Sequence, residues 1–116
     1  MRKKNFKGRC EKKYVSKGNT ICKTYDPIQA AYIDMLEKNP EIIEIMSNVE
    51  LDGNEAGEYA TDIVCKKMSG ELLVRECVSN KIIARPLTGK LLDLSRTYWL
   101  RRGVRDWGIV TDAAEE

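Results

Sequence analysis

The 116-residue sequence contains no histidine, and none of its four cysteines belongs to a C-x-x-C pair. These absences exclude a histidine general base and a mixed cysteine–histidine zinc site, and the cysteine spacing argues against an all-cysteine zinc site. A Gly-rich phosphate loop and a Ser or Cys catalytic dyad are also missing. No apolar run approaches the roughly 20 residues of a membrane span, and no apolar stretch follows the basic N-terminus as in a signal peptide. We therefore expect a cytoplasmic protein with no membrane partner.

Charge is unevenly distributed along this chain. Residues 1–24 contain nine Lys or Arg residues and one acid, so their net charge is +8, whereas the remainder carries −6. A basic arm on an acidic body suggests phosphate contact, although a solvated, partly disordered tail has the same composition. Residues 25–113 are expected to form the folded domain and 114–116 an acidic tail. The expected DNA-binding residues of the arm are Lys3, Lys4, Lys7, Arg9, Lys12, Lys13 and Lys17.

Two helices are predicted from apolar periodicity and end signals. The first begins after Asp26, which can cap its free N–H groups, and ends by Asn39, because Pro40 disfavours a helical residue before it. The second runs from Pro86 or Thr88 to Arg102 and ends at Gly103. Its Tyr98 and Trp99 are expected in the core rather than stacked on bases. Three cations near its C-terminal end could interact with the negative end of the helix dipole or contact a phosphate: Arg101, Arg102 and Arg105.

Four β-rich stretches predict strands at Ile42–Leu51, Tyr59–Lys67, Glu71–Val78 and Trp107–Thr111. Asp52-Gly53-Asn54 is a turn signal, and Ser69-Gly70 joins the second and third strands as an antiparallel hairpin. The cysteines of this hairpin, Cys65 and Cys77, are expected to be reduced core residues. A helix between the hairpin and the last strand implies a crossover connection. The sequence therefore predicts an α/β fold with a central mixed sheet flanked by helices.

An acid lies on each strand of the predicted hairpin. Asp62 and Glu76 would face each other, and two carboxylates can hold Mg²⁺ for phosphodiester hydrolysis. Such chemistry usually includes a lysine two residues after the second acid, where this chain has Val78. The alternative interpretation is a strand pair with two half-exposed acids. Arg75 is then a salt-bridge partner rather than a phosphate clamp.

The sequence from Asp26 to Asp112 resembles the catalytic domain of the TnsA family, transposon-end endonucleases of the PD-(D/E)xK superfamily. KLLDLSRTYWLRRGVRDWGIVTD (90–112) is similar to a family pattern with Tyr-Trp, Arg-Gly and a closing Trp-x-x-Val-Thr-Glu. QAAYIDMLEKNPEIIEI (29–45) resembles the family's first helix and following strand, and ATDIV (60–64) its Thr-x-Asp-Phe type motif. The resemblance implies a single-domain, restriction-endonuclease-like fold. Phage head-completion nucleases share part of this layout.

The family's functional positions are only partly retained. Its strand aspartate falls on Asp62 and its second acid on Glu76, which the resemblance makes ligands of Mg²⁺ or Mn²⁺. Its first-helix glutamate falls on Gln29, which can orient water, and its lysine on Val78. A displaced ammonium group could come from Lys66, which shares a face with Asp62 in a regular strand, or from Lys81.

Two functions follow from these matches and departures. The first is a metal-dependent DNA endonuclease of a mobile element, a transposon or phage, acting with a partner transposase. Its catalytic set would be Gln29, Asp62, Glu76 and Lys66 or Lys81. The second is a binding module whose nuclease chemistry is lost and which binds DNA or a protein, as a mobile-element regulator or an inhibitor of host defence. The changes at Gln29 and Val78 favour an impaired or inactive site.

Overall fold

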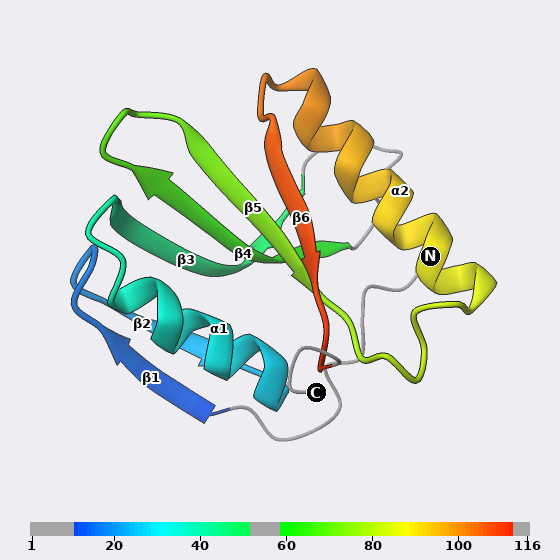
Figure 1. Ribbon diagram of the computed structural model, residues 1–116, viewed down its shortest axis with the longest axis horizontal. Helices are drawn as coiled ribbons and strands as arrows, with labels where there is room; N and C mark the ends of the chain where they lie inside the picture. The colour runs from blue at the N-terminus through cyan, green and yellow to red at the C-terminus, as the bar shows by residue number, and fades with distance from the viewer. Residues whose placement is uncertain (1–10, 52–58, 113–116) are drawn as a thin grey trace.

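The structure is a computed structural model that describes residues 11–51 and 59–112, and its centre is a four-stranded mixed sheet (Figure 1). In chain order the elements are β1 (Glu11–Val15), β2 (Thr20–Thr24), α1 (Pro27–Glu37), β3 (Ile42–Glu50), β4 (Ala60–Lys67), β5 (Leu72–Cys77), α2 (Pro86–Arg101) and β6 (Asp106–Val110). The strand order in the sheet is β3-β4-β5-β6, with β5 and β6 parallel and the other neighbours antiparallel. The predicted α/β fold with a central mixed sheet is thus confirmed.

Helix α1 begins where the sequence predicts. The Asp26 carboxylate accepts a hydrogen bond from the backbone N–H of Gln29 at 2.8 Å, and Pro27 is the first helical residue. This cap satisfies a backbone donor that has no partner within the helix. The helix ends at Glu37, ahead of Pro40. The cap fixes the third residue of the helix, Gln29, against the sheet.

The β4–β5 hairpin also matches its prediction. Ile63 lies opposite Arg75 and Cys65 opposite Leu73, and the turn between the strands contains Gly70 at φ +94°. Only glycine adopts this conformation without strain. The register places the beginning of β4 beside the end of β5, where the two acids lie.

Helix α2 provides the crossover between the hairpin and β6. Pro86 is its first residue, and Gly103 follows its end at φ +86°. The backbone N–H of Val104 then bonds to the carbonyl of Trp99 at 3.0 Å and closes the helix end. The chain returns as β6, whose Trp107 lies opposite Val74 in the parallel register.

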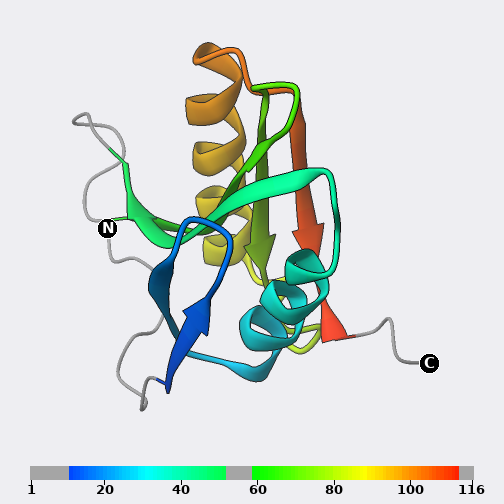
Figure 2. The same cartoon turned by 90° about the vertical axis from the view of Figure 1, so that its left-hand side faces the viewer.

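The two faces of the sheet carry separate core clusters, with α1 on one face and α2 on the other (Figure 2). Ile33 and Leu36 of α1 pack with Ile63, Cys65 and other residues of the first cluster. The second cluster is formed by α2 and the opposite sheet face, and it includes Leu51, Tyr59, Val64, Val74, Leu91, Tyr98, Trp99 and Val104. Within 11–51 and 59–112, no helix is long and apolar enough to cross a membrane.

Regular structure begins earlier in the chain than the sequence predicts. Residues 11–24, predicted to belong to a basic arm, form an antiparallel ribbon of β1 and β2 beside α1 (Figure 1). Val15 and Cys22 of this ribbon are 0% and 2% exposed and belong to the first core cluster. The sequence does not indicate these strands clearly, because only three of their residues are buried and most of the others are polar or charged. The rest of the arm, the 52–54 turn signal and the 114–116 tail lie outside the described residues.

Candidate functional site

The two acids of the β4–β5 hairpin lie side by side and are buried. Asp62 is 5% exposed and Glu76 is 0% exposed. The backbone N–H of Asp62 donates to Glu76 Oε1 at 3.2 Å, and the backbone N–H of Cys77 donates to Asp62 Oδ2 at 2.7 Å. Each acid therefore accepts a hydrogen bond from the backbone of the neighbouring strand. The alternative interpretation of half-exposed acids does not describe this arrangement.

Helix α2 supplies a further donor to Glu76. The Ser95 hydroxyl donates to Glu76 Oε2 at 2.6 Å, and it accepts a hydrogen bond from the Trp107 indole N–H at 3.0 Å. Ser95 is fully buried. Ser95 was not among the predicted site residues, although a small polar residue at a core-facing position of an amphipathic helix is a usable signal. Hydrogen bonds of this kind compensate the large cost of burying a carboxyl group.

Tyr59 borders the same acids. Burial raises the pKa of the Tyr59 hydroxyl above its ordinary value, and the nearby Glu76 and Asp62 carboxyl groups raise it further. The hydroxyl consequently stays protonated at every physiological pH. Tyr59, Asp62, Glu76 and Ser95 together are called the buried acid cluster below.

Gln29 occupies the position beneath this cluster on the α1 side. Its Nε2 donates to the Asp62 carbonyl at 3.0 Å and to Asn48 Oδ1 at 3.1 Å, and its Oε1 accepts the N–H of Tyr25 at 2.9 Å. Asn48 in turn donates through Nδ2 to the carbonyl of Lys23 at 2.7 Å. The Gln29 side chain thus bridges α1, β3 and β4, and both its donors and its oxygen are engaged by protein groups.

The burial and hydrogen bonds of Asp62 and Glu76 are typical of a closed hydrogen-bonded network rather than of a solvent-accessible cation site. Mg²⁺ keeps several water ligands and therefore requires solvent access to its carboxylates. Glu76 has no exposed surface, and both of its oxygens accept hydrogen bonds from Asp62 and Ser95. Across the described ranges, no group of three or more His, Cys, Asp or Glu residues is arranged to hold a metal ion. In this arrangement Asp62 Oδ2 and both Glu76 oxygens accept hydrogen bonds from protein donors.

The three positions considered for the catalytic lysine lie in different places. Val78 is 2% exposed and its N–H bonds to the Val110 carbonyl. Lys66 is exposed and four residues along β4 from Asp62, which separates their Cα atoms by roughly 13 Å. Lys81 is exposed in the turn after β5, where its backbone N–H bonds to Ser79 Oγ. The structure brings neither ammonium group into the buried acid cluster.

A largely apolar hollow of about 580 Å³ lies just past Val78, at the end of β5. Its lining includes Pro27 and Ile28 of α1, Leu87 and Leu91 of α2, and Cys77 at the end of β5. Arg85, Asp26 and Asp112 also line it. Neither Asp62 nor Glu76 is among the residues that line this hollow.

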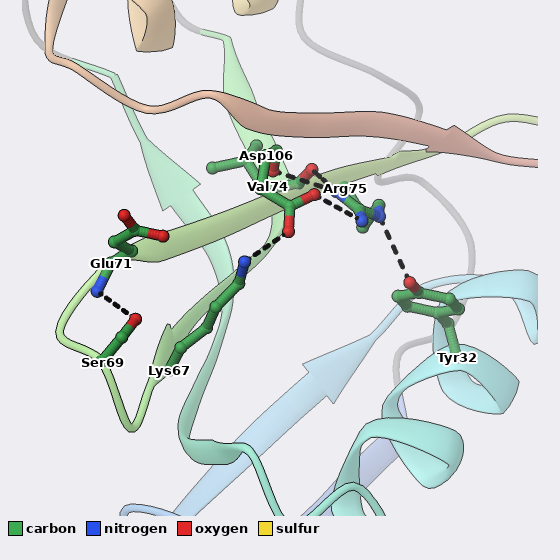
Figure 3. Close-up of polar contacts among 7 residues, drawn as sticks. All are labelled: Tyr32, Lys67, Ser69, Glu71, Val74, Arg75 and Asp106. Carbon is green, nitrogen blue, oxygen red and sulfur yellow. Dashed lines mark hydrogen bonds and ion pairs between the residues drawn. The ribbon is translucent and has the colours of Figure 1, made fainter.

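Arg75 joins an ion cluster with Asp106 and the Tyr32 hydroxyl (Figure 3). Because successive residues of a strand point to opposite faces, its neighbour Glu76 lies on the other face of the sheet. The Arg75 guanidinium donates to Asp106 Oδ1 at 2.7 Å and to the Tyr32 hydroxyl at 3.2 Å, and Lys67 Nζ lies 2.6 Å from Asp106 Oδ2. The interpretation of Arg75 as a salt-bridge partner is confirmed. The hydrogen bond from Lys67 is the main reason that the pKa of Asp106 lies below its ordinary value.

The expected DNA-binding lysines of the ribbon have different surroundings. Lys13 pairs with Asp34 at 2.7 Å, and Lys17 Nζ donates to the Ile42 carbonyl at 2.7 Å. Lys12 is exposed, as is Lys23, which the expected set did not include. The remaining members lie outside the described residues: Lys3, Lys4, Lys7 and Arg9.

The aromatic residues of α2 are core residues, as predicted. Tyr98 and Trp99 are 8% and 7% exposed, and the Trp99 indole donates to Thr61 Oγ1 at 2.9 Å. The Arg102 guanidinium lies 3.6 Å from the centre of the Tyr98 ring and donates to the Tyr98 carbonyl. Arg102 therefore closes the end of the helix, while Arg101 and Arg105 are exposed.

No protein-family model and no curated protein sequence matches this chain, so the TnsA resemblance rests on the residues quoted for it.

Proposed function

We propose that this protein is a nuclease-like domain that binds DNA without cutting it. The observation that carries the proposal is the enclosure of Glu76. Its side chain is fully buried, and its two oxygens accept hydrogen bonds from the Asp62 N–H and the Ser95 hydroxyl. A metal ion with its water shell has no place there unless this core opens.

The proposed origin is a TnsA-like endonuclease whose centre has become structural. Gln29 stands where the resemblance expects a glutamate, and its amide donates to the Asp62 carbonyl. A glutamate could not make that bond in its ionised form. Val78 replaces the expected lysine with a buried apolar side chain. Gln29 adds a neutral amide to the hydrogen-bonded network and Val78 adds an apolar side chain, so both departures remove charges that catalysis would use.

DNA is proposed as the ligand because of the charge distribution. Residues 1–24 carry a net +8 on a chain whose remainder is acidic. Cations on one segment neutralise phosphates and release counterions, which gives affinity that falls steeply with salt and depends little on sequence. A role inside a mobile element, with a transposase or another protein as partner, follows from the resemblance and belongs to the same proposal.

The test combines binding, metal titration and cleavage on the full chain. We expect duplex DNA binding that weakens as salt rises, no heat of binding for Mg²⁺ or Mn²⁺ in calorimetry, and no nicking of supercoiled plasmid with either metal. Metal binding at micromolar concentration together with nicking that Asp62→Asn abolishes would contradict the proposal. Absence of DNA binding at low salt would contradict the proposal that the protein binds DNA.

The second candidate is the metal-dependent endonuclease itself. It is favoured by one observation, the contact between Asp62 and Glu76 on adjacent strands. In that case the wild type nicks plasmid with Mg²⁺ or Mn²⁺. Separate Lys66→Ala and Lys81→Ala variants then identify which ammonium group, if either, replaces the missing lysine.

A further inference from the structure

The β1–β2 ribbon has two unlike faces. On its inner face, Val15, Cys22 and Thr24 are at most 3% exposed and pack toward the body of the protein. Lys13, on that same side, is neutralised by Asp34 of α1. The inner face thus contributes to the fold, and its cation is already paired.

The outer face combines cations with exposed apolar groups. Lys12 lies directly opposite Lys23, and Tyr14 directly opposite Ile21. Tyr14 is 64% exposed and Ile21 is 61% exposed. In the part of the chain that the structure describes, neither lysine has an ion-pair partner. These four residues are called the outer ribbon face.

This arrangement costs folding stability. Like charges directly opposite each other on antiparallel strands are destabilising, and exposed aromatic and aliphatic side chains gain nothing from burial. Local departures of this kind are expected where a surface is adapted to a ligand rather than to the fold. The two lysines of the outer ribbon face would complement an anionic ligand.

The ribbon is also held in a defined shape. Its turn contains Gly18 at φ +87° and Asn19 at φ +51°, and the Tyr14 hydroxyl donates to Asn19 Oδ1 at 2.6 Å. This bond orients the Tyr14 ring along the ribbon. A surface that is ordered before binding loses less entropy when it binds.

We infer that the outer ribbon face is the surface that contacts duplex DNA, with Lys12 and Lys23 on the phosphates and Tyr14 and Ile21 against the sugars between them. The inference rests on the proposed DNA-binding function and identifies its surface. A two-stranded ribbon is an element that duplex DNA accommodates along its major groove, and phosphate contacts give the register. Residues 1–10, which precede this face in the sequence, contain five further Lys or Arg residues.

The test compares two variants that remove the same charge. Lys12→Gln/Lys23→Gln alters the outer ribbon face, whereas the control Lys90→Gln/Arg96→Gln alters exposed positions of α2, on the other side of the sheet. Affinity for a fluorescent duplex is measured by anisotropy over a range of salt concentrations. Each lost phosphate contact lowers the salt slope by about 0.9, so the ribbon variant should lose about 2 in slope and about tenfold or more in affinity at low salt. The control should retain the wild-type slope within about 0.5.

A stability measurement separates this role from a structural one. Removing the like-charge pair should leave the urea midpoint unchanged or raise it, while DNA affinity falls. The further variant Ile21→Glu keeps both lysines but adds an anion to the face, and it should also weaken DNA binding without unfolding the protein.

The outcomes distinguish the two proposals. Wild-type binding to duplex DNA with an unaffected Lys12→Gln/Lys23→Gln variant overturns the ribbon inference and leaves DNA binding in place. Tighter binding of single-stranded RNA than of duplex DNA also overturns it. Failure of the wild type to bind DNA at any salt concentration overturns both.

Discussion

Neighbouring residues of β5 hold their ionisable side chains in different surroundings on the two faces of the sheet. Glu76 points toward α2, where it is fully buried and accepts hydrogen bonds from the Ser95 hydroxyl and a backbone N–H. Arg75 points toward the α1 side, where it pairs with Asp106 and the Tyr32 hydroxyl. The Asp106 side chain keeps 35% of its exposure. A polar group enclosed by neutral donors and a partly exposed ion pair should therefore respond differently to mutation and pH.

This difference decides which residues a functional assay can interpret. A substitution near Glu76 would alter the stability of the core and the proposed ancestral active site at the same time. Around Asp106, whose side chain is 35% exposed, water and salt partly screen the charges, so its substitution should have a smaller effect on stability. Folding must therefore be measured beside activity for every variant of the buried acid cluster.

The largest effect is expected for Glu76→Ala. The change leaves the Ser95 hydroxyl and the Asp62 N–H without this acceptor and creates a cavity, so the free energy of unfolding should fall by about 3–4 kcal/mol. Urea unfolding followed by circular dichroism measures it. The matched control Glu71→Ala removes an exposed glutamate from the turn before β5 and should change stability by less than about 0.5 kcal/mol. Equal losses in the two variants would show that Glu76 is not held as described.

The next effect is expected for Gln29→Glu, the change that restores the residue type implied by the TnsA resemblance. An ionised glutamate places acceptors against the Asp62 carbonyl and Asn48 Oδ1, where Gln29 Nε2 now donates. The free energy of unfolding should fall by about 2–3 kcal/mol at pH 7. These acceptors raise the folded pKa of the new carboxyl group above its unfolded value, so the loss should shrink as the pH falls through the folded pKa.

The same variant discriminates between the two proposed functions. Gln29→Glu combined with Val78→Lys should not give metal-dependent nicking if the centre is structural. Gln29→Ala is the control for loss of the amide without added charge, and its loss of stability should not depend on pH in this way. Nicking by the double variant, with its fold verified by circular dichroism, would contradict the non-cleaving proposal.

Most of the sheet could be predicted because its signals are local. Asp26-Pro27 and Gly103 mark helix ends, and Ser69-Gly70 marks the hairpin turn, through backbone chemistry that needs no tertiary contact. The ribbon could not be predicted in this way. Its burial of Val15 and Cys22 depends on α1 and the sheet, and the charged residues between them resemble an unfolded arm.

The site could be predicted only as a pair of positions. The hairpin register follows from the turn, so the proximity of Asp62 and Glu76 is visible in the sequence. Their enclosure is not, because it depends on Ser95 from α2 and on Gln29 from α1, which approach from opposite sides. Lys66 was considered as a replacement lysine because it shares a strand face with Asp62. Sharing a face does not bring two side chains together when they are four residues apart along the strand.

The smallest effect on stability is expected for Asp106→Asn, in the ion cluster that Asp106 forms with Lys67 and Arg75. Lys67 and Arg75 lie 2.6 and 2.7 Å from its two oxygens, and the Lys67 hydrogen bond is the main cause that lowers the pKa of Asp106 below its ordinary 3.8, against the opposing effect of burial. Because the folded pKa is below the unfolded one, the carboxylate stabilises the fold fully above about pH 4, and this contribution disappears as the pH falls through the folded pKa. Exposure and screening limit the loss at pH 7 to about 0.5–1 kcal/mol. Urea midpoints at pH 7 and in steps down to pH 3 should draw closer for wild type and Asp106→Asn as the pH falls below about 4, and they should differ less at high salt. The control Asp93→Asn, at an exposed position of α2, should follow the wild type throughout. A loss as large as that of Glu76→Ala, or one that persists unchanged at pH 3, would mean that the two faces of β5 do not differ in the way their contacts indicate.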